Sequence, residues 1–316
     1  MINKPFVSII LPTYNRAHLL TRAVETVLAQ TFPDWELIIW NDGSTDETVK
    51  ILDAYHDPRI RTFSASNQGK SAALNQALKQ ANADIFAFLD DDDCWMPEFL
   101  ERQMAILRAQ PELDLVFGNF RNVNVARNLE EDGFRQNAPG LNRLHTEELG
   151  GGAKHITGGF LEGISTENFI AFDTVLVRKR LTERVGPFNT NLNGGEDFEF
   201  WWRAGLQGLQ AAFTEEIGLI RYKYPGSLSG SEVATRLNFL QTLDACAEAS
   251  RQVGKPETIE LLRPAYRNTW QNMIEMYGKQ KDTTGMLKSF KNACKYGFQP
   301  GTLGALMRAL IQIISS

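Results

Sequence analysis

The sequence predicts an α/β protein with a mostly parallel central sheet flanked by helices, followed by a helical C-terminal region. Three observations indicate this class. Continuous apolar runs of strand length recur through residues 1–120, and segments of helical periodicity lie between them. Uninterrupted apolar runs of this kind are typical of strands buried on both faces of a parallel sheet. Beyond residue 230, helical periodicity dominates to the end of the chain.

The first part of the chain alternates regularly between strands and helices. We expect strands at residues 7–11, 35–40, 60–63, 85–89 and 115–117. We expect helices at residues 19–28, 44–55, 71–80 and 97–109. The second of these helices is predicted from a capping box, Ser44-Thr45-Asp46-Glu47. This alternation requires a mostly parallel sheet with helices on both faces.

The middle of the chain has a different character. Residues 128–159 are rich in Gly, Asn and charged residues and show no strong period, so we expect them to be irregular or mobile. Periodicity returns in a strand at 169–177 and in a helix at 198–206. We predict two regions, residues 1–229 and a helical region at 230–316, and the first divides into halves of about 1–120 and 121–229.

Composition and charge exclude several classes of protein. The 33 Lys and Arg against 38 Asp and Glu give a net charge of −5, which argues against a partner made of nucleic acid. Three scattered cysteines form neither a disulfide framework nor a zinc motif, so a reducing compartment fits best. The N-terminus lacks the apolar segment of a signal peptide, and no apolar run approaches the ~20 residues of a membrane span. We therefore expect a cytoplasmic protein.

Polar clusters follow three of the predicted strands at the edge where ligands bind in open parallel sheets. These clusters are residues 13–15, residues 41–44 and the run Asp90, Asp91, Asp92 and Asp93. Four consecutive aspartates repel one another unless a cation lies among them, and Mg²⁺ and Mn²⁺ take carboxylate oxygens as ligands. The alternative is a solvated acidic turn before a helix, where aspartate suits the helix dipole.

The ordered set of motifs resembles the inverting family 2 glycosyltransferases of the GT-A fold, a nucleotide-diphospho-sugar transferase superfamily with a Rossmann-like sheet. The matching segments are residues 7–16, 41–46, 67–69 with Asn75, 89–93, 195–201 and 225–229. They occur in the same order as in the family and at a spacing compatible with it. The resemblance implies that the half at about 1–120 binds the nucleotide sugar and that the half at about 121–229 faces the acceptor.

The resemblance also implies which residues bind the donor. They are Pro12, Thr13, Tyr14, Asn15, Asp42, Asn67, Gly69, Asp90 and Asp91. In the family, the aspartate at the position of Asp42 accepts the imide N–H of uracil, which suits a carboxylate. The alternative is that Asp42 and Gly43 form only a tight turn, with Ser44 as a helix cap.

The metal is implied to be Mg²⁺ or Mn²⁺, held by Asp92 and Asp93 next to the diphosphate. Two registers of the family's acidic motif fit the run. The favoured one places Asp90 near the ribose or uridine and makes Asp91 the variable position. Which carboxylate oxygen contacts the ion stays open.

The base that takes the proton from the acceptor hydroxyl is implied to be Asp197, and Glu196 would position Asp197 or the acceptor. Without the upstream motifs, two acids at a helix start need no explanation beyond the helix dipole. A single displacement with a base on the acceptor side inverts the anomeric centre and needs no separate nucleophile. Phe198, Trp201 and Trp202 follow at helical spacing and are expected in the core.

The implied reaction is transfer of a sugar, expected to come from a UDP-sugar, to a hydroxyl group of a saccharide or lipid-linked acceptor in cell-surface polysaccharide synthesis. Two alternatives remain. A sugar-phosphate nucleotidyltransferase has a similar sheet and acidic site, but it begins with a Gly-rich phosphate loop, and residues 12–15 contain no glycine. A non-catalytic nucleotide-sugar-binding protein is disfavoured because both acidic motifs are present.

Two features fall outside this pattern. Family members often carry Arg and His just before the segment at 225–229, where this chain has Tyr222 and Tyr224, although Arg221 or Lys223 would serve as substitutes. Apolar residues at 303–314 fall on one helical stripe, which indicates packing on the protein body or, as the alternative, shallow peripheral contact with the cytoplasmic face of a membrane.

Overall fold

The computed structural model describes residues 5–124, 128–134, 138–223 and 233–314. Its helices are α1 (Ala17–Leu28), α2 (Thr48–Asp53), α3 (Lys70–Gln80), α4 (Phe99–Ala109), α5 (Phe160–Thr166), α6 (Lys179–Val185), α7 (Glu196–Leu206), α8 (Val233–Gln252), α9 (Ile259–Lys279), α10 (Thr283–Lys295) and α11 (Pro300–Ile314). Its strands are β1 (Val7–Thr13), β2 (Trp35–Asn41), β3 (Ile60–Ser64), β4 (Ile85–Phe88), β5 (Asp93–Trp95), β6 (Leu115–Asn124), β7 (Leu129–Asp132), β8 (His145–Gly150), β9 (Ala153–Gly158), β10 (Val175–Arg178) and β11 (Ala211–Lys223).

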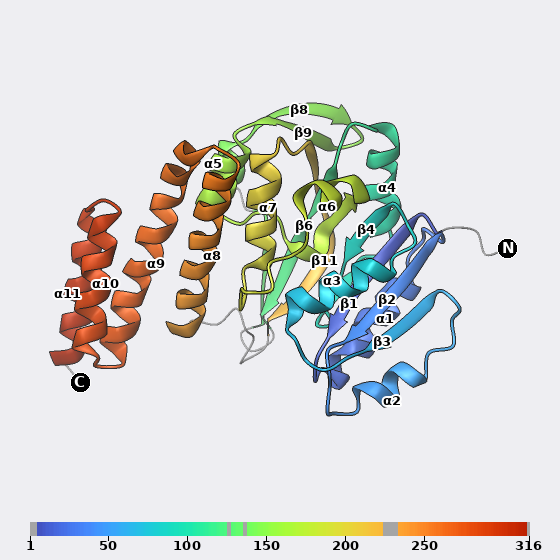
Figure 1. The fold of residues 1–316 in the computed structure, drawn as a ribbon, viewed down its shortest axis with the longest axis horizontal. Coiled ribbons are helices and arrows are strands. Elements are labelled where there is room, and N and C mark those ends of the chain that lie inside the picture. The colour runs from blue at the N-terminus through green and yellow to red at the C-terminus, as the bar shows by residue number, and fades with distance from the viewer. Residues whose placement is uncertain (1–4, 125–127, 135–137, 224–232, 315–316) are drawn as a thin grey trace.

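The strands form one central sheet in the order β3-β2-β1-β4-β10-β6-β11-β9-β8, with β5 paired to β11 and β7 to β6 (Figure 1). The first four strands of this order are parallel, as the alternation of strands and helices predicts. Strand β10 then runs antiparallel between β4 and β6, so the sheet as a whole is mixed. The predicted α/β class, with helices on both sides of a central sheet, is confirmed.

The core lies on both faces of the sheet. All seven residues of β1 are buried, which explains why its sequence is a continuous apolar run. One face packs against α1 and α4, and the other, rich in aromatic residues, packs against α3 and α7. The carboxyl ends of β1, β2 and β4 meet at one edge of the sheet, so the polar clusters that follow them are brought together.

Two predictions for the middle of the chain are wrong. Residues 128–159 are not irregular, because they contain β7 and the antiparallel hairpin of β8 and β9. The strand expected at 169–177 is a 3₁₀ turn at Phe172–Thr174 followed by the short strand β10. The segments at 225–229, including the predicted boundary near Ser229, lie outside the described residues, so the division into regions stays a prediction.

The predicted capping box at residues 44–47 is also wrong. Helix α2 begins at Thr48, and its N-cap residue, Glu47, makes no side-chain capping bond. Ser44 Oγ instead accepts a hydrogen bond from the backbone N–H of Asn15. The Asp46 carboxylate binds the backbone N–H of Thr48. Ser44 therefore links the turn after β2 to the turn after β1 and does not cap the helix.

The four C-terminal helices lie beside the sheet domain in succession, with α11 farthest away (Figure 1). Helix α8 packs on α7, where Trp202 donates a hydrogen bond to Ser250 and Phe198 meets Phe239 edge to face. Helix α9 carries α10 and α11 on its other side. None of the helices in the described ranges is both long enough and apolar enough to cross a bilayer.

A buried carboxylate on β2 makes the fold sensitive to acid. Burial of Glu36 favours its neutral form, but hydrogen bonds from Ser8, Asn82 and Arg61 outweigh this and lower its pKa below 4.5. A depressed folded pKa adds stability above the unfolded pKa, and this stability is lost as the pH falls through the folded pKa. We expect Glu36→Gln to lose about 1–3 kcal/mol at neutral pH.

The measurement is the free energy of unfolding by urea at pH values from 7 down to 3. Wild type should lose stability more steeply than Glu36→Gln as the pH falls below about 5. Glu112→Gln replaces an exposed glutamate and is the matched control, expected to follow wild type. Parallel curves for wild type and Glu36→Gln would contradict this role for Glu36.

Candidate active site

The turn after β1 is fixed by the turn after β2. Asn15 adopts a left-handed conformation with φ of 52°. Its backbone N–H donates to Ser44 Oγ at 2.9 Å, and its side-chain oxygen accepts from Thr45 N–H at 2.7 Å. Three other residues predicted to bind the nucleotide sugar lie here. Pro12 and Thr13 are buried at the end of β1, and Tyr14 is exposed. The two turns therefore form one rigid unit at the sheet edge.

Asp42 connects this unit to the loop that precedes α3. It is buried, and its two carboxylate oxygens accept hydrogen bonds from the backbone N–H groups of Gln68 at 3.0 Å and Gly69 at 2.8 Å. Each oxygen has a second lone pair for a further donor. Asn67 is exposed beside them, and Gly69 has a φ of 88° as the N-cap of α3. The predicted residues Asp42, Asn67 and Gly69 are thus brought together.

Gly43 permits the close approach of these two loops. Its φ is +79°, and a Cβ atom there would lie 2.7 Å from the backbone nitrogen of Asn67. We expect Gly43→Ala to destabilise the fold by about 1–3 kcal/mol and to displace the loop that holds Asp42. Gly254→Ala is the matched control, because Gly254 has a φ of +72° but open space around it.

Thermal unfolding and UDP titration of both variants separate the two effects. Gly254→Ala should lose only the stability that a positive φ costs an alanine, and it should keep the wild-type UDP affinity. Gly43→Ala should lose stability and UDP affinity together. Equal UDP affinity for wild type and Gly43→Ala would show that the contact between these loops is unimportant for the nucleotide.

The four consecutive aspartates point to different partners. Asp90 pairs with Lys70 at 2.7 Å, and Asp91 accepts a hydrogen bond from Thr13 at 2.6 Å. The carboxylate of Asp92 has one ion pair among the described residues, at 3.4 Å to Arg16. The Asp93 carboxylate lies 3.4 Å from Arg221, so the run is not a simple solvated turn.

Burial and mutual repulsion make these carboxylates unusually basic. Burial, with added repulsion from the aspartates on either side of it, raises the pKa of Asp91 to about 7 against the hydrogen bond from Thr13. Burial also raises the pKa of Asp93 to about 7, although Arg221 opposes the shift. The pKa of Asp92 is raised for the same reason, with Asp90 the main neighbouring charge. The site therefore holds more negative charge than its own cations compensate.

Asp173 adds a fifth carboxyl group that the sequence did not single out. It lies in the 3₁₀ turn before β10, fully buried, and burial together with Asp90 and Asp93 raises its pKa well above the ordinary value. One oxygen accepts the backbone N–H of Asp90. The other accepts no hydrogen bond within the described residues and lies 3.5 Å from Arg221.

Lys70 joins the aspartate run to the second acidic motif. Its ammonium group lies 2.7 Å from Asp90 and 3.6 Å from Glu196 at the start of α7. Desolvation opposes its charge, but the carboxylates of Asp90, Glu196 and Asp173 raise the pKa of Lys70 well above its ordinary value. Acidic residues more than 100 positions apart in the sequence therefore converge on one cation.

The start of α7 presents Glu196 and Asp197 differently. Glu196 is buried, and its burial raises its pKa despite the nearby ammonium of Lys70. Asp197 is half-buried, and Oδ2 of its carboxylate accepts a hydrogen bond from the Asn168 side chain at 3.0 Å. The negative charge of Asp197 is also felt at Arg221, whose pKa it helps to raise against desolvation, after the nearer Asp93, Asp173 and Asp90.

Helix α8 holds the turn that precedes this motif. Thr242 Oγ1 donates to the carbonyl of Gly194, and Asn238 donates its side-chain N–H to the carbonyl of Asn193. Gly195 is the N-cap of α7 with a φ of 74°, and a Cβ there would lie 2.7 Å from Thr242 Oγ1. The C-terminal region therefore fixes the position of the acidic pair.

The composition of this site fits a bound dication. Three cationic side chains, Lys70, Arg16 and Arg221, pair with five carboxyl groups, those of Asp90, Glu196, Asp92, Asp93 and Asp173. Among the described residues, one buried oxygen of Asp173 accepts no hydrogen bond. No group of three or more His, Cys, Asp or Glu side chains in the described residues forms a ready-made metal cage. Mg²⁺ is often held by one or two carboxylates together with substrate phosphates, which suits this arrangement.

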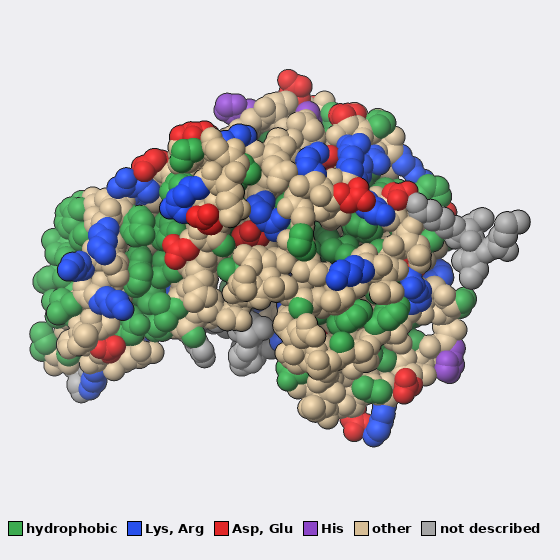
Figure 2. Space-filling view, viewed as in Figure 1, with side chains coloured by type: hydrophobic (Ala, Val, Ile, Leu, Met, Phe, Trp, Pro, Cys, Tyr) green, Lys and Arg blue, Asp and Glu red, His purple; other side chains and the backbone are tan. Residues whose placement is uncertain are grey.

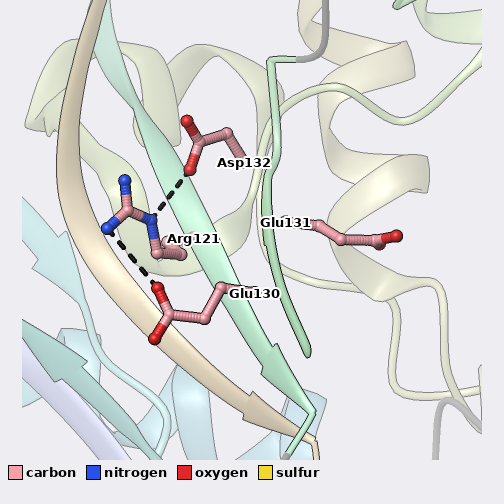
Figure 3. Close-up of a pocket in the computed structure, with 4 residues that line it drawn as sticks. All are labelled: Arg121, Glu130, Glu131 and Asp132. Atoms are coloured by element: carbon pink, nitrogen blue, oxygen red, sulfur yellow. Dashed lines mark hydrogen bonds and ion pairs between the residues drawn. The ribbon is translucent and has the colours of Figure 1, made fainter. Parts of the chain in front are cut away.

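A separate hollow lies where β6 meets β7 and is lined by Arg121 and by residues 130–132 (Figure 3). Arg121 pairs there with Asp132 at 2.9 Å and with Glu130 at 3.6 Å, whereas the side chain of Glu131 points away from Arg121. The guanidinium is already neutralised, and none of the predicted site residues lines the hollow. We therefore place the candidate site at the sheet edge.

Several residues of the site were not in the predicted set. Lys70 and Arg16 lie next to or within the motifs, and Arg221 was recognised only as a substitute for missing family residues. The positive charge of these three residues, in or near the recognised motifs of the sequence, could have indicated that they belong to the site. Asn168 and Asp173 gave none, since they lie in an apolar segment without a turn or cap motif, and only the fold brings them to the site.

Comparison with known proteins gives consistent relatives. Residues 8–161 match the family described as Glycosyl transferase family 2. The chain is 34% identical over 193 residues to the chondroitin synthase of Escherichia coli, covering 58% of this chain and 27% of that protein. It is 37% identical over 120 residues to the E. coli UDP-Glc:alpha-D-GlcNAc-diphosphoundecaprenol beta-1,3-glucosyltransferase WfgD, covering 37% of this chain and 47% of WfgD.

A solved structure shares the fold over nearly the whole chain. S. aureus TarS 1–349 in complex with UDP superposes with a TM-score of 0.66 at 18% identity, covering 98% of this chain and 88% of that one. The match spans only 27% of the length of the chondroitin synthase and 47% of the length of WfgD.

Proposed function

Because residues 8–161 place this chain in glycosyltransferase family 2, we propose that it transfers a sugar from a UDP-sugar to a hydroxyl group of a saccharide or lipid-linked acceptor, with inversion at the anomeric carbon. One observation carries the proposal. Lys70 contacts both Asp90 and Glu196, so the aspartate run and the Glu196–Asp197 pair share one site. The donor end and the base of a single displacement must be neighbours in this way.

The donor end is supported by the two linked turns. Asp42 keeps a lone pair on each oxygen beyond the bonds from Gln68 and Gly69, and a carboxylate so held is suited to accept the imide N–H of uracil. The rigid turn at Asn15 forms the wall beside it. UDP in the TarS structure of the same fold is consistent with this choice of nucleotide.

The metal is proposed to be Mg²⁺ or Mn²⁺, with Asp92 as the principal protein ligand and Asp93 close to it. When bound, it would neutralise the charge that develops on the leaving diphosphate. Asp93 is held by Arg221, and Asp90 is held by Lys70, so both are less available as ligands. Lys70 and Arg16 would add positive charge on either side of the diphosphate.

The base is proposed to be Asp197. Its carboxylate is half-exposed, as a group that meets an incoming acceptor must be, and the hydrogen bond from Asn168 fixes its orientation. Glu196 is buried against Lys70 and would position the start of α7. Asp197 would take the proton of the acceptor hydroxyl as the oxygen attacks the anomeric carbon, an effect worth typically 10²–10⁴-fold.

The acceptor class is supported by relatives. Their names include a chondroitin synthase and an enzyme that acts on an undecaprenol-linked sugar. We propose a growing saccharide, free or linked to a lipid, in cell-surface polysaccharide synthesis. A cytoplasmic location, where such donors are used, stays a prediction.

The experiment is a donor screen with the purified chain, Mn²⁺ and a panel of saccharide and lipid-linked acceptors. UDP release should depend on one UDP-sugar, and NMR of the product should show an inverted anomeric centre. GDP-mannose serves as the donor control and should be inactive. Pyrophosphate formed from UTP and a sugar 1-phosphate, or tight UDP-sugar binding without any turnover, would overturn the proposal in favour of the two alternative functions.

A further inference from the structure

Helix α11 packs its small residues against the protein. Thr302, Ala305 and Ala309 are buried, and α11 lies along α9. The approach is close, since a Cβ atom on Gly278 of α9 would lie 2.6 Å from the Cβ of Ala309. Leu306, Leu310 and Ile313 are partly buried against the cluster that contains Ala305 and Ala309, so the inner side of α11 carries both its small residues and part of its large apolar residues.

Four other large apolar residues of α11 face outward. Leu303, Met307, Ile311 and Ile314 are between 46% and 83% exposed. At 100° per residue they share one arc of about 80°, opposite the buried alanines. The predicted stripe of apolar residues is therefore real, but packing on the protein body does not explain its outer half. Large apolar residues gathered on one exposed face indicate an interaction surface.

The neighbouring helix extends this surface and adds positive charge. Leu287 on α10 is 56% exposed, and Phe298, between α10 and α11, is 60% exposed. Lys288, Lys291 and Lys295 are exposed within about 100° of Leu287 around α10. Within the described residues, none of these three lysines is ion-paired with an acid, whereas Arg16, Lys70 and Arg221 at the candidate active site are.

The charge of this region is opposite to that of the rest of the chain. Residues 279–316 carry six Lys and Arg and one acidic residue, a net charge of +5. The whole chain has a net charge of −5, which leaves −10 for residues 1–278. The cations are thus concentrated beside the exposed apolar stripe. Figure 2 shows hydrophobic side chains with Lys and Arg among them over the end of the molecule formed by α10 and α11.

We propose that the outer face of α10 and α11 docks onto an anionic lipid bilayer. Apolar residues that enter the headgroup region, flanked by lysines that meet lipid phosphates, are the features of a surface-bound amphipathic helix. A second copy of the chain fits less well, because a symmetric contact through this face would bring two regions of net charge +5 together. The helix lies on the membrane and does not cross it, in keeping with its 15 residues.

The test is flotation of the full chain with vesicles made of phosphatidylcholine and phosphatidylglycerol in equal parts. The protein should float with these vesicles, should float far less with phosphatidylcholine alone, and should be released by high salt. The triple variant Leu303→Ser, Met307→Ser and Ile311→Ser should lose at least about a hundredfold in partition. Lys288→Gln, Lys291→Gln and Lys295→Gln together should lose at least about tenfold.

A matched control keeps folding and binding apart. Phe6, Val49 and Leu129 are exposed to a similar degree elsewhere on the chain, and their triple change to Ser should float like wild type. Circular dichroism should show all variants folded, because every altered side chain is exposed. Absence of flotation, flotation unaffected by the α11 changes, or a dimer in light scattering that the α11 changes dissolve would each overturn the proposal. None of these outcomes depends on sugar transfer.

Discussion

Replacing Asp197 with Asn is expected to reduce sugar transfer by about 10²–10⁴-fold while leaving UDP affinity nearly unchanged. The amide keeps the size of the side chain and still accepts the hydrogen bond from Asn168 at the oxygen end. It cannot take a proton from the acceptor. The proposed donor site, built on Asp42 and the aspartate run, is not altered by the change. The measurement is kcat with saturating donor, beside UDP binding by calorimetry.

The control must separate proton transfer from the electrostatics of a helix start. Glu260 is also an acid in the first turn of a helix, α9, and is far from the sheet edge in sequence and fold. Glu260→Gln removes the same favourable charge near a helix N-terminus, worth about 0.3–1 kcal/mol, and should leave kcat unchanged. If Asp197→Asn retained more than a tenth of the wild-type kcat, Asp197 would not be the base.

The loops at the sheet edge could be predicted from sequence because their chemistry is local. When a buried strand is followed by a turn of Thr, Asn, Asp and Gly, the sequence indicates both where the strand ends and which polar groups the turn presents. Asn15, Asp42 and Asp90 lie where this logic puts them. The same logic misjudged Ser44, because a hydroxyl that caps a helix and one that receives a neighbouring loop have the same local sequence.

The wrong predictions have physical causes that a single sequence does not reveal. Strand β8 is almost entirely exposed, so it lacks the apolar pattern by which strands are recognised. Gly150, Gly151 and Gly152 looked like an irregular segment, yet all three have positive φ values and turn the chain between β8 and β9. The apolar run before Asp173 resembles a strand, but residues 169–171 are irregular and lead into the 3₁₀ turn at Phe172–Thr174. Burial stabilises apolar residues in any backbone conformation, so their hydrophobicity alone does not indicate a strand.

Tertiary contacts decide the rest of the site. Thr242 and Asn238 come from a helix that shows only core periodicity in sequence, yet they bind the turn before Glu196. Lys70 has no signature beyond being a lysine after a glycine, and its importance follows from two carboxylates that the fold places beside it. The acidic motifs were visible in the sequence, whereas the groups that position them were not.

Replacing Asp92 with Asn should abolish the additional thermal stabilisation that Mn²⁺ gives in the presence of UDP. We favour Asp92 as the ligand because its one ion pair among the described residues is the 3.4 Å contact with Arg16, and both of these side chains are partly exposed. Asp90 and Asp91 have closer partners at 2.7 and 2.6 Å, and Asp93 is buried against Arg221. A ligand held at a hundred times its dissociation constant adds about 2.7 kcal/mol, which is the stabilisation at stake in wild type. Transfer activity should fall by at least about a hundredfold.

Asp91→Asn is the matched neighbour for this test. With a pKa of about 7, Asp91 is partly protonated near neutral pH, and an amide can replace its neutral form opposite Thr13. This variant should keep the Mn²⁺ response, and without metal it should be at least as stable as wild type, because it removes one repelling charge. If Asp91→Asn lost the Mn²⁺ response and Asp92→Asn kept it, the metal ligand would be Asp91 and not Asp92. Loss in neither would mean that no dication binds at this run.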